Sequence, residues 1–248
     1  MFQKEIEISG TQIPQTSLGT APFNREPHFG HRAVLYELDL FNKPENILKT
    51  IEKSYQLGVK SIQLIPSTPV IKAIQMAQEK GIKLEILGTV GENYQEDIKL
   101  LQTLNTKIYL IDEKITDTHN WKLITKINQK IKETGGITGL ITARPFQTTK
   151  KLQTSPILDQ FDLYMIPINK ISYMMDGEFF FTEQRENFKK LITSLNKKII
   201  ASRVLATGIQ KPQEAFQFIK TLDYIDLICV GVAYEKEAEE TWKILFQD

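Results

Sequence analysis

The chain has 248 residues, of which 41% are hydrophobic and 25% are charged. Its net charge of +1 excludes a global field that would direct it to nucleic acid or to an anionic membrane. The single cysteine, Cys229, excludes an intrachain disulfide and a thiolate metal cluster. No apolar run approaches the ~20 residues of a membrane span, and the N-terminus lacks a signal-peptide core. We therefore expect a cytoplasmic protein.

The N-terminal residues predict a small β-hairpin. In the stretch KEIEISGTQIP, glutamate and isoleucine alternate before a polar turn, which we place at Gly10 and Thr11. Alternation with a period of two is typical of a strand with one buried face.

Eight short β-branched runs follow, each separated from the next by a polar turn and an amphipathic stretch. They cover residues 17–20, 59–65, 83–90, 107–112, 138–143, 162–169, 198–203 and 226–233. Eight strand–helix units in this length predict a single (β/α)8 TIM barrel over residues 1–248, with the hairpin as a plug at its bottom. The active site of such a barrel lies at the C-terminal ends of the strands.

The amphipathic stretches predict eight helices around the barrel. The first covers residues 45–57, with Gly58 just beyond its end. The next four helices begin near Pro69, Asn93, Asp117 and Thr148. The sixth helix covers residues 183–195, the seventh begins after Lys211 and Pro212, and the eighth covers residues 235–246.

The segment between the first strand and the first helix, residues 21–45, is the longest before a helix. Loops of this length in a compact domain are usually functional or disordered. The aromatic side chains of this segment argue against disorder. We therefore expect it to contribute to the site.

Several patterns resemble the aldo/keto reductases. The hairpin followed by IPQTSLGTAPF, and a helix ending in LGV before the second strand, are similar to the opening of that family. FDLYMIPIN is similar to its sixth strand, and the stretch from KIIASRVLATG to DLICVGVAYEKEAEE is similar to its last two units. The resemblance implies a TIM barrel that binds a nicotinamide cofactor and uses a tetrad of Asp, Tyr, Lys and His.

The tetrad positions implied by this resemblance carry other residues here. They fall on Gln63, near Thr68, on Val90 and on Asp112. Thr68 and Val90 cannot supply the family's proton donor or the lysine that lowers the donor's pKa. AYEKE replaces the basic and hydroxyl residues of the cofactor site after strand eight. Standard carbonyl reduction is therefore not expected. No cofactor is required by the sequence, and binding of NADP stays open as an alternative.

The patterns GTAPF with FGHRA, and VLATG with VGVA, also resemble an uncharacterised group of microbial barrel proteins. That resemblance implies no activity. Any function must therefore be argued from the residues at the strand ends.

Two strand-end residues are candidates for catalysis. His31 follows the first strand and has the imidazole pKa that suits proton transfer near neutrality. Its alternative is a surface or packing histidine. Asp112 ends the fourth strand after a buried run, so its carboxylate could act as a base or bind a hydroxyl. Its alternative is a cap for the turn that follows.

Seven further strand-end residues are candidates for substrate binding. They are Arg32, Gln63, Thr89, Arg144, Asn169, Lys170 and Arg203. The cations among them predict a positively charged mouth that binds a small anionic metabolite, because the guanidinium fork matches carboxylate and phosphate. The alternative is pairing with rim acids such as Glu113 or Asp176. No metal site is predicted, since HxH, HExxH and cysteine clusters are missing.

The leading hypothesis is a non-redox isomerase, lyase or hydrolase in which His31 and Asp112 move protons. One alternative is an atypical nicotinamide-dependent oxidoreductase. Another is a non-catalytic barrel that binds a metabolite or a protein through residues 179–181, or that forms a homo-oligomer.

Overall fold

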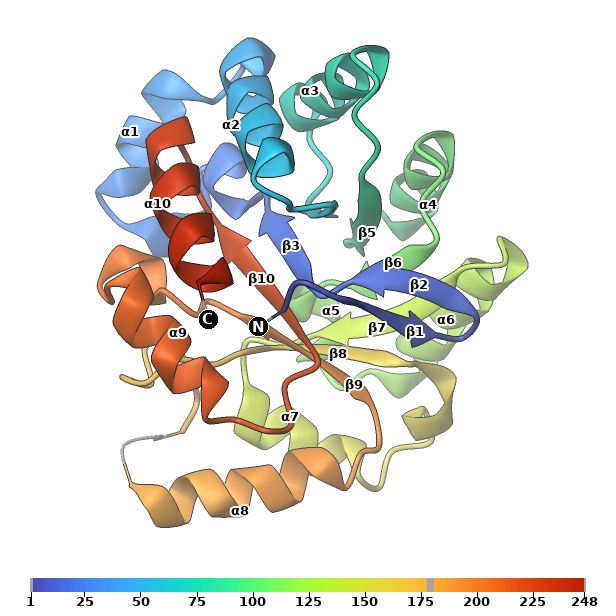
Figure 1. Ribbon diagram of the computed structural model, residues 1–248. Coiled ribbons are helices and arrows are strands. Elements are labelled where there is room, and N and C mark those ends of the chain that lie inside the picture. The colour runs from blue at the N-terminus through green and yellow to red at the C-terminus, as the bar shows by residue number, and fades with distance from the viewer. Residues whose placement is uncertain (1, 178–180, 248) are drawn as a thin grey trace.

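The computed structural model describes residues 2–177 and 181–247. Eight parallel strands close into a barrel in the order β10-β3-β4-β5-β6-β7-β8-β9 (Figure 1). The strands are β3 (Thr16–Gly19), β4 (Ser61–Leu64), β5 (Glu85–Val90), β6 (Ile108–Ile111), β7 (Ile137–Ile141), β8 (Leu163–Pro167), β9 (Lys198–Ser202) and β10 (Leu227–Gly231). The predicted (β/α)8 barrel is confirmed.

Strand register brings the C-terminal ends of the strands to one rim. Gly19 of β3 lies opposite Gln63 of β4, which lies opposite Leu87 of β5. On the other side of the ring, Gly19 lies opposite Gly231 of β10. Residues far apart in the sequence therefore meet at the mouth of the barrel.

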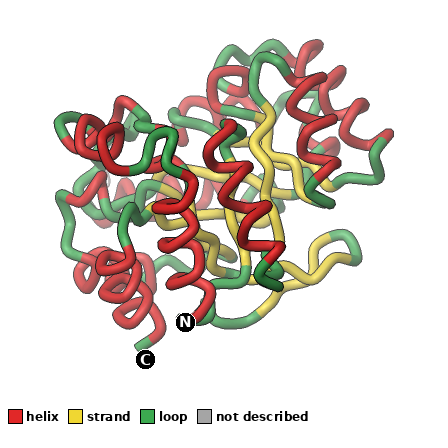
Figure 2. Tube along the Cα trace, turned by 90° about the horizontal axis from the view of Figure 1, so that it is seen from above, coloured by secondary structure: helices red, strands yellow, loops and turns green. Residues whose placement is uncertain are grey.

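Helices surround the strands, as the view from above shows (Figure 2). They include α2 (Pro44–Gln56), α3 (Thr68–Glu79), α4 (Tyr94–Thr103), α6 (Trp121–Glu133), α7 (Pro145–Leu152), α8 (Thr182–Thr193), α9 (Pro212–Lys220) and α10 (Glu235–Phe246). Each buries an apolar face against the barrel, as Ile47, Leu48 and Ile51 of α2 do. Within the described ranges no helix is both long and apolar enough to cross a bilayer.

The helix expected near Asp117 begins instead at Trp121. The Asn120 side chain caps it by accepting a hydrogen bond from the Leu123 N–H at 3.1 Å. Asp117 lies before it and binds Thr142 and the backbone N–H of Ala143. A short helix that was not predicted, α5 (Glu113–Thr116), follows β6 directly.

The long segment 21–45 is folded rather than open. It forms η1 (Ala21–Asn24), η2 (Pro27–Phe29) and a helix that was not predicted, α1 (Arg32–Asp39). Phe23 is fully buried, and the rings of Phe29 and Tyr36 meet edge to face with centroids 5.2 Å apart. These contacts hold the segment over the barrel mouth.

The hairpin consists of β1 (Glu5–Ile8) and antiparallel β2 (Thr11–Pro14). Its turn is Ser9 and Gly10, one residue earlier than expected, because both adopt the positive φ that a two-residue hairpin turn requires. Ile8 and Ile13 pack in one cluster with Leu87, Ile108 and other side chains inside the barrel. The predicted plug at the bottom is confirmed.

Ile13→Ala should lower the free energy of unfolding by about 2–5 kcal/mol, since this fully buried side chain would leave a void under the barrel interior. Gln12→Ala, on the exposed face of the same strand, should change it by no more than about 0.5 kcal/mol. Urea unfolding monitored by circular dichroism measures both. Equal losses would mean that the hairpin does not plug the barrel.

Candidate functional site

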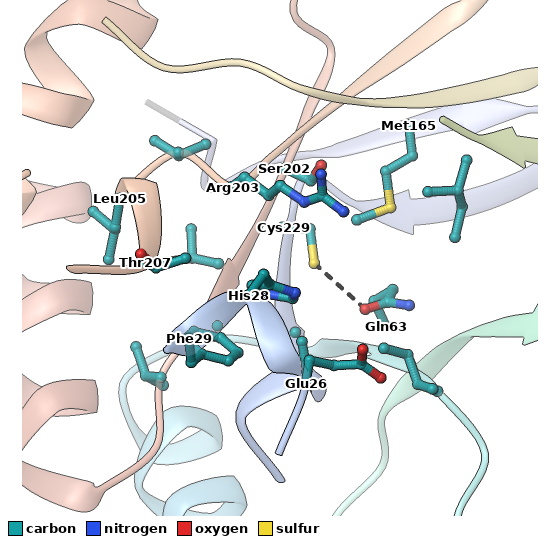
Figure 3. Close-up of a pocket in the computed structure, with 18 of the residues that line it drawn as sticks. Glu26, His28, Phe29, Gln63, Met165, Ser202, Arg203, Leu205, Thr207 and Cys229 are labelled. Atoms are coloured by element: carbon teal, nitrogen blue, oxygen red, sulfur yellow. Dashed lines mark hydrogen bonds between the residues drawn. The ribbon is translucent and has the colours of Figure 1, made fainter. Parts of the chain in front are cut away.

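A cavity of about 510 Å³ opens at the C-terminal end of the barrel. Strand-end residues such as Gln63, Thr89 and Cys229 form its floor, and the loops after β3, β5, β6, β9 and β10 form its walls (Figure 3). This is the end at which TIM barrels carry their active sites. The segment 21–45 supplies one whole wall, through Glu26 to Tyr36.

The floor is polar but uncharged. Gln63 Nε2 donates to Thr89 Oγ1 at 2.6 Å, and the Cys229 thiol faces Gln63 Oε1 at 4.0 Å (Figure 3). Burial raises the pKa of the Cys229 thiol to about 12, so the thiol is neutral at physiological pH. Cys229 thus borders the cavity as a neutral thiol.

Side chains alternate along β5, and this alternation decides which residue meets the cavity. Thr89 lines it, whereas Val90 is fully buried in the layer between strands and helices. The position that sequence resemblance placed on Val90 therefore does not face the site. The cavity-facing residue at that level is Thr89.

Three carboxyl groups meet at one side of the cavity. Glu26 comes from the loop after β3, and Asp112 and Glu113 come from the end of β6. Burial raises the pKa of each. The charges of Asp112 and Glu113 raise the pKa of Glu26 further, while those of Lys114 and Arg203 lower it. The group can therefore hold a proton closer to neutrality than an exposed carboxylate can.

The members of this group differ in how they are bound. Asp112 Oδ1 accepts a hydrogen bond from the Lys114 N–H at 2.9 Å, so its predicted alternative as a cap is confirmed. Both oxygens of Glu113 contact Arg203 Nη2 at 2.7 Å. Among the described residues, no hydrogen bond acts on the pKa of the Glu26 carboxylate, which points into the cavity (Figure 3).

Sequence reasoning missed Glu26 because nothing in the strand pattern distinguishes it. It lies seven residues beyond the end of β3 and reaches the cavity only through the folding of η1 and η2. The available signal was the long aromatic segment that contains it, which was expected to contribute to the site. That expectation did not single out this residue.

His28, and not His31, lines the cavity. Burial, with a smaller contribution from the charge of Arg203, lowers the pKa of His28 to about 4, so its ring is neutral near pH 7. His31 is exposed and stands immediately before α1. The positive φ of Gly30 separates the two, and the chain enters α1 with His31 outside the cavity. The structure does not bring His31 and Asp112 together there.

The other predicted binding residues divide into two groups. Arg32, Gln63, Thr89 and Arg203 line the cavity. Arg144, Asn169 and Lys170 do not.

The residues outside the cavity have other surroundings. Asn169 is fully buried and ties its own loop, accepting from the Tyr173 N–H at 2.8 Å. Arg144 is exposed at the start of α7, and Lys170 is exposed beyond β8. Asp176 caps α7 by accepting from the backbone of Phe146 and Gln147. None of them is positioned to bind a ligand in the cavity.

The predicted cationic mouth does not form. Seven carboxyl side chains line the cavity against four lysines and arginines, and Arg203 is already paired with Glu113. The charge balance therefore disfavours a ligand with net negative charge. The described residues include no group of three or more His, Cys, Asp or Glu side chains able to hold a metal ion.

The sequence predicts a partner surface at residues 179–181. Residues 179 and 180 lie outside the described residues. Phe181 is 64% exposed.

The fold is similar to that of several solved aldo-keto reductase structures. A Pseudomonas aeruginosa protein described provisionally as an aldo-keto reductase is 14% identical, with a TM-score of 0.69 over 97% of this chain and 93% of its own. The holo form of a Bacillus halodurans aldo-keto reductase is 12% identical, with a TM-score of 0.64 over 99% and 91%. Neither a family model nor a curated protein matches the sequence.

These likenesses define the fold: the chain is a (β/α)8 barrel whose overall arrangement is similar to that of these structures. A thermostable aldo-keto reductase in complex with the inhibitor epalrestat is similar as well, at 12% identity and a TM-score of 0.62 over 98% of this chain and 94% of its own. At such identities the likeness concerns the fold, and the activity must be argued from the site.

The residues at the start of α10 do not fit the phosphates of a nicotinamide cofactor. Glu237 Oε2 accepts from the Ala233 N–H at 2.8 Å, which removes a backbone donor from the start of this helix. Glu235 precedes it and Glu240 lies one turn on, where negative charge repels a phosphate. The dinucleotide implied by the fold has no evident phosphate site in this loop.

Glu26→Gln should stabilise the folded protein at pH 7 by roughly 0.5–2 kcal/mol, because it removes a desolvated carboxylate without an ion pair among the described residues. The raised folded-state pKa means that the folded protein binds this proton more tightly than the unfolded chain does. The penalty is therefore absent below the ordinary pKa of 4.5 and complete above the folded-state pKa.

Thermal unfolding of both proteins from pH 4 to pH 8 measures this. Glu239→Gln is the control of opposite sign, because the hydrogen bond to Lys243 lowers the pKa of Glu239. The stability gained by Glu26→Gln over wild type should be larger at pH 7 than at pH 4. A smaller gain at pH 7 would contradict the raised pKa of Glu26.

Proposed function

We propose that this protein is a non-redox enzyme that transfers protons to and from a small polar metabolite. The observation that supports the proposal is the meeting of Glu26, Asp112 and Glu113 with Arg203 in one cavity at the catalytic end of the barrel. Carboxyl groups with displaced pKa values in such a cavity are candidates for general acids and bases. An isomerase or lyase reaction that abstracts a proton beside a carbonyl suits them.

Glu26 and Asp112 divide the roles in this proposal. Burial is the main cause of the raised pKa of Glu26, and the charge of Asp112 raises it further, so we assign the protonated role to Glu26 and the ionised role to Asp112. Glu26 has no hydrogen bond affecting its pKa among the described residues and acts as the acid. Asp112, held by the Lys114 N–H, acts as the base.

The remaining cavity residues bind and orient the substrate. Gln63 and Thr89 offer hydrogen bonds from the floor, and Arg32 and Arg203 polarise a carbonyl or hydroxyl oxygen. His28, neutral near pH 7, can donate or accept one further hydrogen bond. We infer a substrate without net negative charge, because carboxyl groups outnumber cations around the cavity. The cytoplasmic location remains part of this proposal.

Incubation with a library of hydroxy-, keto- and amino-compounds in deuterated water tests the proposal. Proton abstraction replaces a C–H proton by deuterium, and mass spectrometry detects the exchange or a product. Glu26→Gln and Asp112→Asn should each lower the rate about 10²–10⁴-fold. Glu79→Gln, on an exposed residue outside the cavity, should leave it unchanged.

Exchange that persists in both cavity variants would remove these residues from the mechanism. A parallel assay of NADPH oxidation with the same carbonyl compounds distinguishes the redox alternative. Oxidation without deuterium exchange would replace the proposal by an oxidoreductase.

A further inference from the structure

The segments that follow β9, β10 and β3 build a second polar part of the cavity, because these three strands are neighbours in the ring. Arg32 and Tyr36 come from α1, Gln210 comes from the loop before α9, and Glu237 comes from the first turn of α10. All four residues border the cavity. We call this group of four the α1–α10 corner.

Arg32 is closely packed in this corner but has no ionic partner. A Cβ atom at Gly208 would stand only 2.4 Å from Arg32 Nη1, so the glycine leaves the room that the guanidinium occupies. Arg203 is paired with Glu113, whereas Arg32 forms no ion pair with a carboxylate of the described residues. The planar guanidinium matches the two oxygens of a carboxylate, so Arg32 offers a free position for such a group.

A negative charge lies near Arg32 without pairing with it. Burial and the charge of Glu237 raise the pKa of Tyr36, while a side-chain hydrogen bond with Arg32 lowers it. Arg32 and Glu237 therefore both act on the Tyr36 hydroxyl, yet no ion pair joins them. Glu237 Oε2 accepts from the Ala233 N–H at 2.8 Å, which holds this carboxylate at the start of α10. The corner thus presents two neighbouring charges of opposite sign to the cavity.

Gln210 adds an unused hydrogen-bonding group. It is only 7% exposed although it borders the cavity, and its Oε1 atom has no hydrogen-bond partner among the described residues. Buried polar atoms of folded proteins are usually hydrogen-bonded, because leaving one unpaired costs the free energy of its desolvation. An N–H group of a ligand in the cavity would supply the missing bond.

We propose that the α1–α10 corner binds the head group of an α-amino acid, with the carboxylate on Arg32 and the ammonium group on Glu237 and Gln210. Neighbouring unpaired charges of opposite sign complement a zwitterion. A zwitterion carries no net negative charge, in agreement with the surplus of carboxyl groups around the cavity. In a step that rests on the proposed function, the side chain of the amino acid extends to Glu26 and Asp112 and is the part that reacts.

Ligand-detected NMR with each of the twenty standard L-amino acids tests the head-group site without turnover. For an amino acid that binds, two analogues separate the charges: the acid without the α-amino group and the amine without the carboxylate. Arg32→Gln should weaken binding of the amino acid about tenfold or more and should not weaken the amine. Glu237→Gln, which keeps an acceptor for the Ala233 N–H, should weaken the amino acid similarly and should not weaken the acid.

Two glycine variants test the placement of Arg32. Gly208→Ala should weaken the amino acid about tenfold or more, because the new methyl group displaces the guanidinium. Gly81→Ala is the matched control, since Gly81 has a similar positive φ, no atom within 4 Å of an added Cβ and no place in the cavity. It should bind the amino acid as wild type does. Equal losses of affinity in the two variants would overturn the placement.

The proposal is overturned if none of the amino acids binds at about 20 mM, a concentration that detects millimolar Kd values. It is also overturned if Arg32→Gln and Glu237→Gln leave the affinity unchanged. The deuterium-exchange assay separates it from the proposed function. Binding that depends on both residues, without exchange, supports the head-group site and removes only the acid–base reaction. Exchange confined to compounds without this head group, and unaffected by Arg32→Gln, removes the head-group site and leaves the reaction.

Discussion

Closure of eight parallel strands into a ring is the constraint on which the rest of this structure depends. A closed ring leaves no free edge, so every strand is paired on both sides and its side chains alternate strictly between the interior and the surrounding helices. The interior of such a small ring is filled by side chains. Leu110, Leu163 and Ile200 occupy its middle, and the hairpin closes its bottom with Ile8 and Ile13. The cavity lies at the opposite end, where the strands finish.

The filled interior sets the electrostatics of the cavity. The apolar side chains of Ile141 and Met165 lie beneath the cavity and separate it from water on that side. Carboxyl groups placed above such a floor are partly desolvated, and this is the first cause of the raised pKa of Glu26, Asp112 and Glu113. The same desolvation makes an ion pair at this position geometrically specific, since each charge needs its partner. The raised pKa values and the pairing of Glu113 with Arg203 thus have a common physical origin.

The sequence patterns located the elements more accurately than the site. Apolar runs and the amphipathic stretches between them depend on burial, which repeats with a fixed period along each element, so the eight strands and most helices could be predicted. The short helices α1 and α5 were missed because their apolar pattern is brief. Val34, Leu35 and Leu38 of α1 are apolar but exposed in the structure, so burial against the barrel does not explain their pattern.

The candidate site was predictable only in part, as two pairs of neighbours show. Thr89 and Val90 are adjacent on β5, yet only Thr89 meets the cavity, because the pleat turns the next side chain outward. His28 and His31 stand three residues apart, and the turn at Gly30 leaves His28 inside and His31 outside. Closeness in sequence to a strand end therefore could not decide which residue of each pair faces the cavity.

The sequence by itself determined the barrel, its plug and the rim on which a site must lie, because these follow from the spacing of apolar residues along the chain. Only the tertiary structure decided which charges face each other. Arg203 meets Glu113 across ninety residues, and Glu26 joins them from a loop whose path depends on the packing of Phe23, Phe29 and Tyr36. Pairing of charges depends on distances in space, and the linear pattern of the chain does not contain them.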